Sequence, residues 1–285
     1  MQLRNALMGS AMRYLPLCFT LFALLMLSCR HPQSRMEEPD GTGTFSMKAA
    51  FGKTLFSLDS TLLTLQVTDT AEEAFGALWC PLCQLYHTRA AEAVYPFAYH
   101  FSLNGDTTCR DAAIHLGAWL IAQQESDGSW KETPEEWTGT TTDQLLMMAQ
   151  AFPLLERYLE KDEKEKWKYS MMAAGNYLVK VMEPSFASIN YVATTAATMA
   201  VLNNLLPDTI YENKARNLAH QVVSMMDPDH FITGEGGRVN GVKYGVDLTY
   251  NMEMSLWGLA LYARITGDDF VMEKVQASLE RHLWF

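Results

Sequence analysis

Apolar residues follow a helical period along most of this 285-residue chain. From residue 88 onward they recur at i, i+3, i+4 and i+7, which predicts helices that bury one face. No later segment alternates like a strand, and residues 46–70 are ambiguous between a strand and a short helix. The segments with helical spacing are 88–103, 107–125, 141–160, 162–182, 189–206, 209–227, 248–265 and 268–283.

The predicted helices form pairs joined by short, similar connections. These read LNGD at 103–106, LEKD at 159–162, LLPD at 205–208 and ITGD at 265–268, and each ends in Asp. Asp is a favourable N-cap because its side chain accepts a hydrogen bond from an N–H group that opens a helix. The repeat therefore predicts four helical hairpins, each of which begins its second helix at an aspartate.

The connections between hairpins are longer and lead into the first helix of each pair. They span 126–140, 183–188 and 228–247, and segment 79–87 introduces the first pair. Stacked hairpins bury their faces in an open solenoid or in a closed α/α toroid. In a toroid the first helices form an inner ring whose N-termini open on one face. We therefore expect an all-α fold of paired antiparallel hairpins forming an α/α toroid, with a site on that face.

The N-terminal residues have the pattern of a bacterial lipoprotein signal. Arg4 and Arg13 precede an apolar run from Leu15 to Leu27, which ends in the lipobox MLSC with Cys29 as the lipidated residue. The run is shorter than the roughly 20 residues that a spanning helix needs. We expect a membrane-anchored lipoprotein on the periplasmic or cell-surface face of the outer membrane.

This pattern sets the expected domain organisation. Residues 1–28 are the signal peptide, 29–45 a flexible tether rich in polar residues, and 46–285 the toroid domain. Four hairpins leave the ring incomplete, so we expect the domain to be truncated at its C-terminus. With 48% apolar residues the domain can fill one large core, and a net charge of −11 argues against a nucleic-acid partner.

Residues able to carry chemistry gather where the long connections enter the first helices. Helix N-termini carry partial positive charge, so several that converge favour an anionic ligand. Each residue also has a structural interpretation: the acids as first-turn or solvated charges, the aromatic rings as core, and the histidine as a cap. The candidates are His87, Arg89, Trp130, Glu136, Trp137, Asp143, Asn190, Tyr191, Arg238, Tyr244, Asp247, Tyr250, Asn251 and Glu253.

The segment WCPLC resembles a zinc knuckle. Cys80 and Cys83, with His87 and Cys109, offer four ligands for a structural zinc. In an oxidising compartment a disulfide between two of the three cysteines is as compatible with the sequence, and free thiols are the third alternative. Gln84 stands where a knuckle usually has Gly, which weakens the zinc interpretation. No cofactor is required otherwise.

Three stretches resemble the α/α-toroid domain of heparinase II/III-like polysaccharide lyases. They are CPLCQLYHTRAAEAVYPFAY, DGSWKETPEEWTGTTTDQ and GVKYGVDLTYNMEMSLWGLALYARITGD, so the resemblance covers residues 80–283. It implies a toroid that binds an anionic polysaccharide or oligosaccharide containing uronic acid. Such lyases carry a C-terminal β-sandwich, and none follows in this sequence.

The resemblance also implies β-elimination. An Asn, Gln or Arg neutralises the C5 carboxylate, a Tyr or His removes the C5 proton, and a Tyr protonates the leaving oxygen. Asn190 or Asn251, with Arg89 and Arg238, are the candidates for neutralisation. Tyr191, Tyr250 and His87 are the candidates for proton transfer, and the loop aromatics, Glu136, Tyr244 and Asp247 for substrate binding.

Two other classes of function stay open. A toroid glycoside hydrolase would use paired carboxylates, and Glu136, Asp143, Asp247 and Glu253 are candidates. A non-catalytic glycan-binding lipoprotein would need only the aromatic side chains and the helix termini. The charge of the ligand discriminates between them, because only a lyase requires a uronate.

Overall fold

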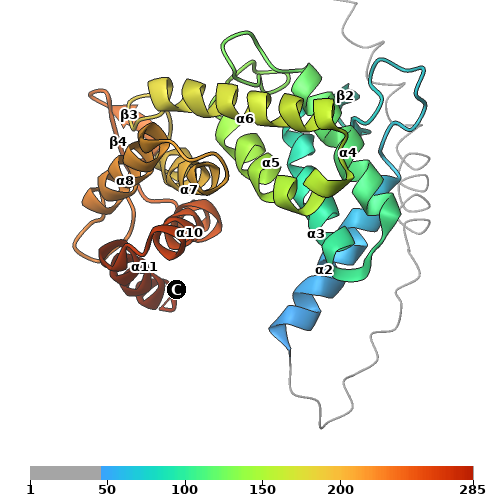
Figure 1. The fold of residues 1–285 in the computed structure, drawn as a ribbon. Helices are drawn as coiled ribbons and strands as arrows, with labels where there is room; N and C mark the ends of the chain where they lie inside the picture. The colour runs from blue at the N-terminus through green and yellow to red at the C-terminus, as the bar shows by residue number, and fades with distance from the viewer. Residues whose placement is uncertain (1–45, 285) are drawn as a thin grey trace, which may run out of the picture. The chain divides into compact units, whose positions relative to one another are not determined.

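The computed structural model describes residues 46–284, shown as a coloured ribbon in Figure 1. The chain divides into two units, Met1–Ala49 and Ala50–Phe285, and the fold given below is that of the second. The expected signal peptide, lipidation site and tether lie outside the described residues. Between residues 46 and 284, no helix combines the length and the apolar character that crossing a membrane requires.

Helices make up most of the described chain, as predicted. The ambiguous segment forms α2 (Met47–Leu63), and a 3-10 turn η1 (Thr88–Ala93) precedes the first hairpin. The four hairpins are α3 (Val94–Asn104) with α4 (Thr107–Ala122), α5 (Thr141–Leu155) with α6 (Lys161–Val181), α7 (Ile189–Leu205) with α8 (Thr209–Ser224), and α10 (Leu256–Thr266) with α11 (Asp269–His282). The 3-10 turn η2 (Glu156–Tyr158) follows α5, and the short α9 (Leu248–Tyr250) and a π-helical turn η3 (Asn251–Ser255) precede α10.

The hairpins stack in an arc with an inner and an outer row. Helices α3, α5, α7 and α10 contact one another in that order, and α4, α6, α8 and α11 lie behind them in the same order (Figure 1). The first helix of every pair is therefore the inner one. This is the arrangement of an α/α toroid, and it confirms the predicted fold class.

Aspartate caps begin three of the four second helices, as the repeat predicts. The side chains of Asp106, Asp208 and Asp268 accept backbone hydrogen bonds at the starts of α4, α8 and α11. The prediction is wrong for α6, where the N-cap is Glu160 and Asp162 lies in the first turn. A capping box with Glu163 satisfies the N–H groups there, which removes the need for an aspartate.

Inner helices are buried on more than one face because they lie between the outer row and their inner neighbours. Helices α5 and α7 accordingly carry small and hydroxyl side chains that allow close approach. Thr195 donates to Thr142 Oγ1 across the two helices at 2.9 Å, and Thr142 and Thr198 hydroxyls lie 3.0 Å apart. On the other side, a Cβ at Gly258 of α10 would lie 2.8 Å from the Ala193 carbonyl oxygen of α7. These contacts fix the spacing of the three helices that border the site.

Two short hairpins interrupt the helical pattern, and only the second lies after residue 88, where no segment alternates like a strand. Strands β1 (Trp79–Cys80) and β2 (Leu85–Tyr86) pair, as do β3 (Glu235–Val239) and β4 (Val242–Gly245). Asn240 and Gly241 connect the second pair with φ angles of 51° and 83°, the geometry that favours a two-residue hairpin turn. The buried Glu235 joins this hairpin to α7, because its side chain accepts from the Asn190 N–H at 3.0 Å.

Candidate active site

A cavity of about 280 Å³ opens at the N-terminal ends of the inner helices. Its walls come from η1, the first turns of α5 and α7, η3 and the start of α10, which is the face that the toroid topology predicts. Three predicted site residues line it, namely Arg89, Asp143 and Glu253. The other lining residues are Glu92, Leu146, Met147, Thr194, Met254 and Trp257.

Arg89 is the centre of a charged cluster on one side of this cavity. Its guanidinium lies 3.3 Å from a carboxylate oxygen of Glu92, 3.3 Å from one of Glu132 and 3.9 Å from one of Asp143. Burial alone would lower the pKa of Arg89, but Glu92 and the other neighbouring acids outweigh it and raise that pKa. One guanidinium thus faces three carboxyl groups, which leaves an excess of negative charge when all are ionised.

Burial reduces that excess by favouring the neutral acids. The Asp143 side chain is only 8% exposed, and desolvation raises its pKa well above the usual value, with Glu92 raising it further and Arg89 opposing. Desolvation likewise raises the pKa of Glu92. Asp143 Oδ2 has no hydrogen-bond partner among the described residues, since its contact with Arg89 is long. A buried acid without a partner beside a cavity is typical of functional sites.

Aromatic side chains border the cluster. Desolvation raises the pKa of Tyr191 to about 12, while the charge of Arg89 opposes the rise, so its hydroxyl holds its proton at neutral pH. The ring of Trp137 packs edge-to-face on Tyr191 with centroids 4.7 Å apart. Tyr250 is 43% exposed, and its hydroxyl also acts on the pKa of Tyr191. The structure thus groups Trp137 and Tyr250 around Tyr191, although none of these three predicted residues is among those that line the cavity.

The two candidate asparagines lie beneath this surface. Asn190 is 2% exposed; its Oδ1 accepts from the Tyr191 N–H, and its Nδ2 lies 3.3 Å from the sulfur of the cavity residue Met254. Asn251 is fully buried, and neither of its side-chain polar atoms has a hydrogen-bond partner within the described chain. Asn251 also begins the π-helical turn, a feature that is frequent at functional sites.

Two residues of the first long loops are not brought to the cavity. Trp130 is completely buried, and its indole N–H donates to the Leu120 carbonyl at 2.8 Å, so the ring fills core behind α4 and cannot stack on a sugar. Glu136 has a 75% exposed side chain that lies 3.9 Å from Lys131. The expected sugar-binding role of Trp130 conflicts with its burial, whereas Glu136 is exposed but is not among the residues that line the cavity.

The β3–β4 hairpin and α9 hold three further candidates away from the cavity. Arg238 donates to the carbonyl oxygens of Ser185 and Gly241, which ties the hairpin to segment 183–188. Asp247 caps α9 by accepting from the Tyr250 N–H. Tyr244 is 65% exposed on β4 and is not among the lining residues. The roles expected of them in substrate binding find no support in this geometry.

His87 faces the cysteines. Its ring lies with the sulfurs of Cys80 and Cys83, where one ligand atom of each residue lies within 4.8 Å of the others. This position conflicts with the expected role of His87 in proton transfer at the cavity. Cys109 is buried in a different group, with His100 and Asp106, so the expected set of four zinc ligands is not assembled. All three cysteines are free thiols, and the disulfide alternative is not formed.

Sequence reasoning missed Glu132 and Trp257. Glu132 lies in the loop singled out by its composition, but nothing in ETPEEW distinguishes the glutamate that meets Arg89 from its neighbours. Trp257 follows the helical period and resembles a core residue, yet it is 42% exposed at the cavity. The exposure of this large aromatic ring beside the cavity is the signal, and only the structure reveals it.

Comparison with known proteins identifies a domain family that covers most of this chain. Residues 55–285 match the family model of the ulvan lyase N-terminal domain. A broad-specificity ulvan lyase from Formosa agariphila is 28% identical over 235 residues, which cover 79% of this chain and 37% of that protein. The chain therefore spans little more than a third of the length of this curated relative.

Solved structures agree on the fold. A sugar epimerase from a ruminal bacterium superposes with a TM-score of 0.61 at 8% identity, over 82% of this chain and 70% of that one. A possible member of the GH105 family from Salmonella enterica subsp. enterica serovar Paratyphi A gives 0.52 at 12% identity, over 84% and 68%. At such identities these matches show the α/α-toroid fold alone. The family model, which matches residues 55–285, shows that the chain belongs to the ulvan lyase N-terminal domain family.

Proposed function

We propose that this chain is the toroid part of a polysaccharide lyase that cleaves a uronic-acid-containing glycan by β-elimination. The observation that carries the proposal, in a chain of the ulvan lyase N-terminal domain family, is that Arg89 on the cavity wall and the nearby Tyr250 both influence the hydroxyl of Tyr191. Arg89 supplies positive charge for a uronate carboxylate. Tyr191 and Tyr250 supply hydroxyl groups for proton transfer.

The electrostatics allow an anionic ligand to enter. Three carboxyl groups surround Arg89, and their full ionisation would repel a uronate. Because burial raises the pKa of Asp143 and Glu92, their neutral forms are favoured and the charge of Arg89 becomes available. The Asn190 amide adds a donor, since its present partner is a methionine sulfur, a weak acceptor that a carboxylate can replace.

The two tyrosines take different roles. Tyr191 holds its proton at neutral pH and therefore protonates the leaving glycosidic oxygen. We assign removal of the C5 proton to Tyr250, the more exposed of the two side chains, acting as a phenolate that has first released its own proton to solvent. The electron pair of the C5–H bond then forms the C4–C5 double bond as the C4–O bond breaks, and the product carries an unsaturated uronate.

The test uses the full chain and a panel of uronic-acid polysaccharides, with the ultraviolet absorbance of the unsaturated product as the signal. Tyr250→Phe deletes only a hydroxyl group, so we expect turnover to fall roughly 10²- to 10⁴-fold with unchanged binding and melting temperature. Tyr244→Phe is the matched control, because this tyrosine is exposed on strand β4 and, unlike Tyr250, is not among the groups that raise the pKa of Tyr191. Equal loss in both variants, or full activity of Tyr250→Phe, would contradict the assignment.

A glycoside hydrolase is the second candidate, favoured by one observation. Asp143 and Glu253 line the same cavity, and the raised pKa of Asp143 suits a general acid. In that case Asp143→Asn and Glu253→Gln would be inactive, while Tyr250→Phe would keep its activity. Reducing ends would then appear without the ultraviolet signal of an unsaturated product.

The cellular location is a separate proposal that rests on the sequence of residues 1–29. Lipidation of Cys29 would anchor the chain to a bacterial outer membrane, on its periplasmic or cell-surface face. Cys29→Ala should abolish incorporation of labelled palmitate and release the protein from the membrane fraction. Equal labelling of the wild type and the variant would overturn this proposal.

A further inference from the structure

A small hairpin outside the cavity has the backbone of a metal knuckle. Strands β1 and β2 flank the sequence CPLC, and the Cys83 N–H donates to the Cys80 sulfur at 3.4 Å. Gln84 has a φ angle of 56°, the left-handed conformation that glycine adopts readily and other residues rarely do. The turn is therefore formed even though Gln stands at the glycine position. A non-glycine residue held in this conformation is a feature that clusters at functional sites.

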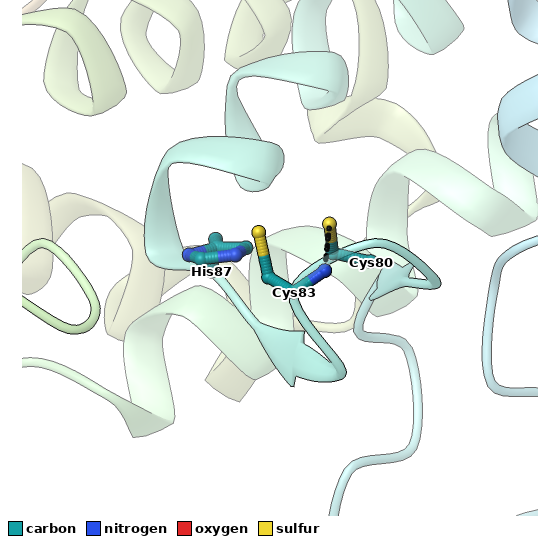
Figure 2. A group of neighbouring side chains, drawn as sticks. All are labelled: Cys80, Cys83 and His87. Atoms are coloured by element: carbon teal, nitrogen blue, oxygen red, sulfur yellow. Dashed lines mark hydrogen bonds between the residues drawn. The ribbon is translucent and has the colours of Figure 1, made fainter. Parts of the chain in front are cut away.

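Three potential metal ligands converge at this turn. The sulfurs of Cys80 and Cys83 and a ring nitrogen of His87 all lie within 4.8 Å of one another, and Figure 2 shows the two thiols and the imidazole close together. Zinc binds sulfur at about 2.3 Å and imidazole nitrogen at about 2.0–2.1 Å, so ligands of one ion lie within roughly 4 Å of each other. Only a small closure of side chains would bring these three atoms to such distances.

His87 is already oriented as a ligand. Its Nδ1 lies 2.8 Å from the Thr133 carbonyl oxygen, which accepts the ring N–H and leaves Nε2 as the free nitrogen. Metal-bound histidines nearly always donate their other ring N–H to such an acceptor, which fixes the tautomer and the ring. The Cys83 side chain is exposed and Cys80 is partly exposed, so an ion can enter from solvent.

A second group of similar composition lacks these properties. In the group of His100, Asp106 and Cys109, Asp106 caps α4, and His100 Nδ1 lies 2.9 Å from the buried Asp59. Burial raises the pKa of Cys109 to about 12, which keeps its thiol protonated. The side chains of this second group already make structural contacts. Cys109 is therefore a control cysteine for experiments on Cys80 and Cys83.

We propose that Cys80, Cys83 and His87 bind a zinc ion through two thiolate sulfurs and the imidazole Nε2, with the fourth position open to solvent beside the exposed Cys83. Binding releases the two thiol protons to solvent, and no redox step is involved. Because His87 and Thr133 already join segment 79–87 to loop 126–140, the ion would fasten this loop. The same loop carries Glu132, the partner of Arg89, so the metal would act as a structural clamp beside the cavity.

The experiment measures zinc in the full chain, purified without chelator or reductant. We expect about one zinc per chain in the wild type. Cys80→Ser and Cys83→Ser should contain almost none, and Cys109→Ser should match the wild type. Replacement of zinc by cobalt should give a thiolate-to-cobalt charge-transfer band in the wild-type protein. This measurement needs no variant, so it holds even where a variant does not fold.

Three results would overturn the proposal. One is a wild-type protein without zinc whose Cys80 and Cys83 resist alkylation until they are reduced, which would show a disulfide. Another is a wild type that neither contains zinc nor gives the cobalt band although both thiols react freely. The last is equal zinc in the wild type and in Cys83→Ser, which would place the ion elsewhere.

A separate readout tests the clamp. Removal of zinc with a chelator should increase amide hydrogen exchange in segment 79–87 and in loop 126–140. The β3–β4 hairpin contains none of the proposed ligands, so its amide hydrogen exchange should not change. Unchanged exchange in loop 126–140 would show that the ion does not fasten it.

Discussion

The cavity has two walls of opposite character. The first wall consists of Arg89, Glu92 and Asp143, whose charges contact one another and whose acids have raised pKa values. The second wall, formed by Glu253, Met254 and Trp257, contains partly or largely exposed side chains from η3 and the start of α10. The first wall sets the electrostatic potential, whereas the groups of the second wall are free to contact a ligand. Substitutions in the two walls should therefore differ in their effect on stability.

The largest effect is expected on the first wall, from Arg89→Met. The variant leaves three carboxyl groups without their cation, so the KM for a uronate substrate should rise roughly 100-fold. The free energy of unfolding should fall by about 1–3 kcal/mol, less than for a fully buried pair, because the Arg89 side chain is 40% exposed. Kinetics and chemical denaturation measure the two effects.

A matched control for Arg89→Met lies on the outer row. Arg216 pairs with Glu212 four residues earlier on α8, with 61% of the arginine side chain exposed. Arg216→Met should cost no more than about 0.5 kcal/mol and leave KM unchanged. If both arginine variants keep the wild-type KM, the first wall does not face the anionic group of the substrate.

The second wall should respond in affinity alone. Trp257 offers an exposed ring at the cavity, so Trp257→Ala should raise KM about tenfold, which corresponds to roughly 1.4 kcal/mol of lost ring contact. The melting temperature should change little because the ring is 42% exposed. Trp284→Ala, at an 82% exposed ring outside the cavity, is the control and should leave KM unchanged. A large fall in the melting temperature of Trp257→Ala would assign this residue to the core.

The contrast between the walls also explains what sequence could predict. Helical periodicity identified all eight long helices of the hairpins, because each must turn an apolar face toward the next layer. The same topology placed Asp143 and Glu253 on one face, since residues that open inner helices share one rim. Both conclusions depend on spacing along the chain.

Loop side chains did not follow from the sequence, because long-range contacts decide where they point. Trp130 fills the core because its indole reaches the Leu120 carbonyl, and Glu132 meets Arg89 across 43 positions while the nearby Glu136 stays exposed. Local signals were available for the β3–β4 hairpin, where Asn240-Gly241 is a strong turn sequence. That signal was missed because neither flanking strand alternates clearly.

Of these substitutions, Asp143→Asn should change stability the least. It gives the clearest test of whether the first wall differs in role from the second. Burial raises the pKa of Asp143 above its usual value, so the stability linked to its protonation is present at low pH and is lost as pH rises through the raised pKa. Asparagine stays neutral and avoids that loss. The free energy of unfolding of the variant should therefore equal that of the wild type in acid. As the pH rises, it should exceed the wild-type value by on the order of 1 kcal/mol.

Kinetics of Asp143→Asn then decide the role of the first wall. If this wall only sets the potential, the variant stays active, and its KM for a uronate falls below that of the wild type at alkaline pH because one negative charge is gone. Glu253→Gln, on the second wall, is the control and should not show this pH-dependent gain in stability. An inactive Asp143→Asn that is folded and binds substrate would instead identify Asp143 as a general acid. The first wall would then perform the chemistry, and the hydrolase alternative would replace the lyase.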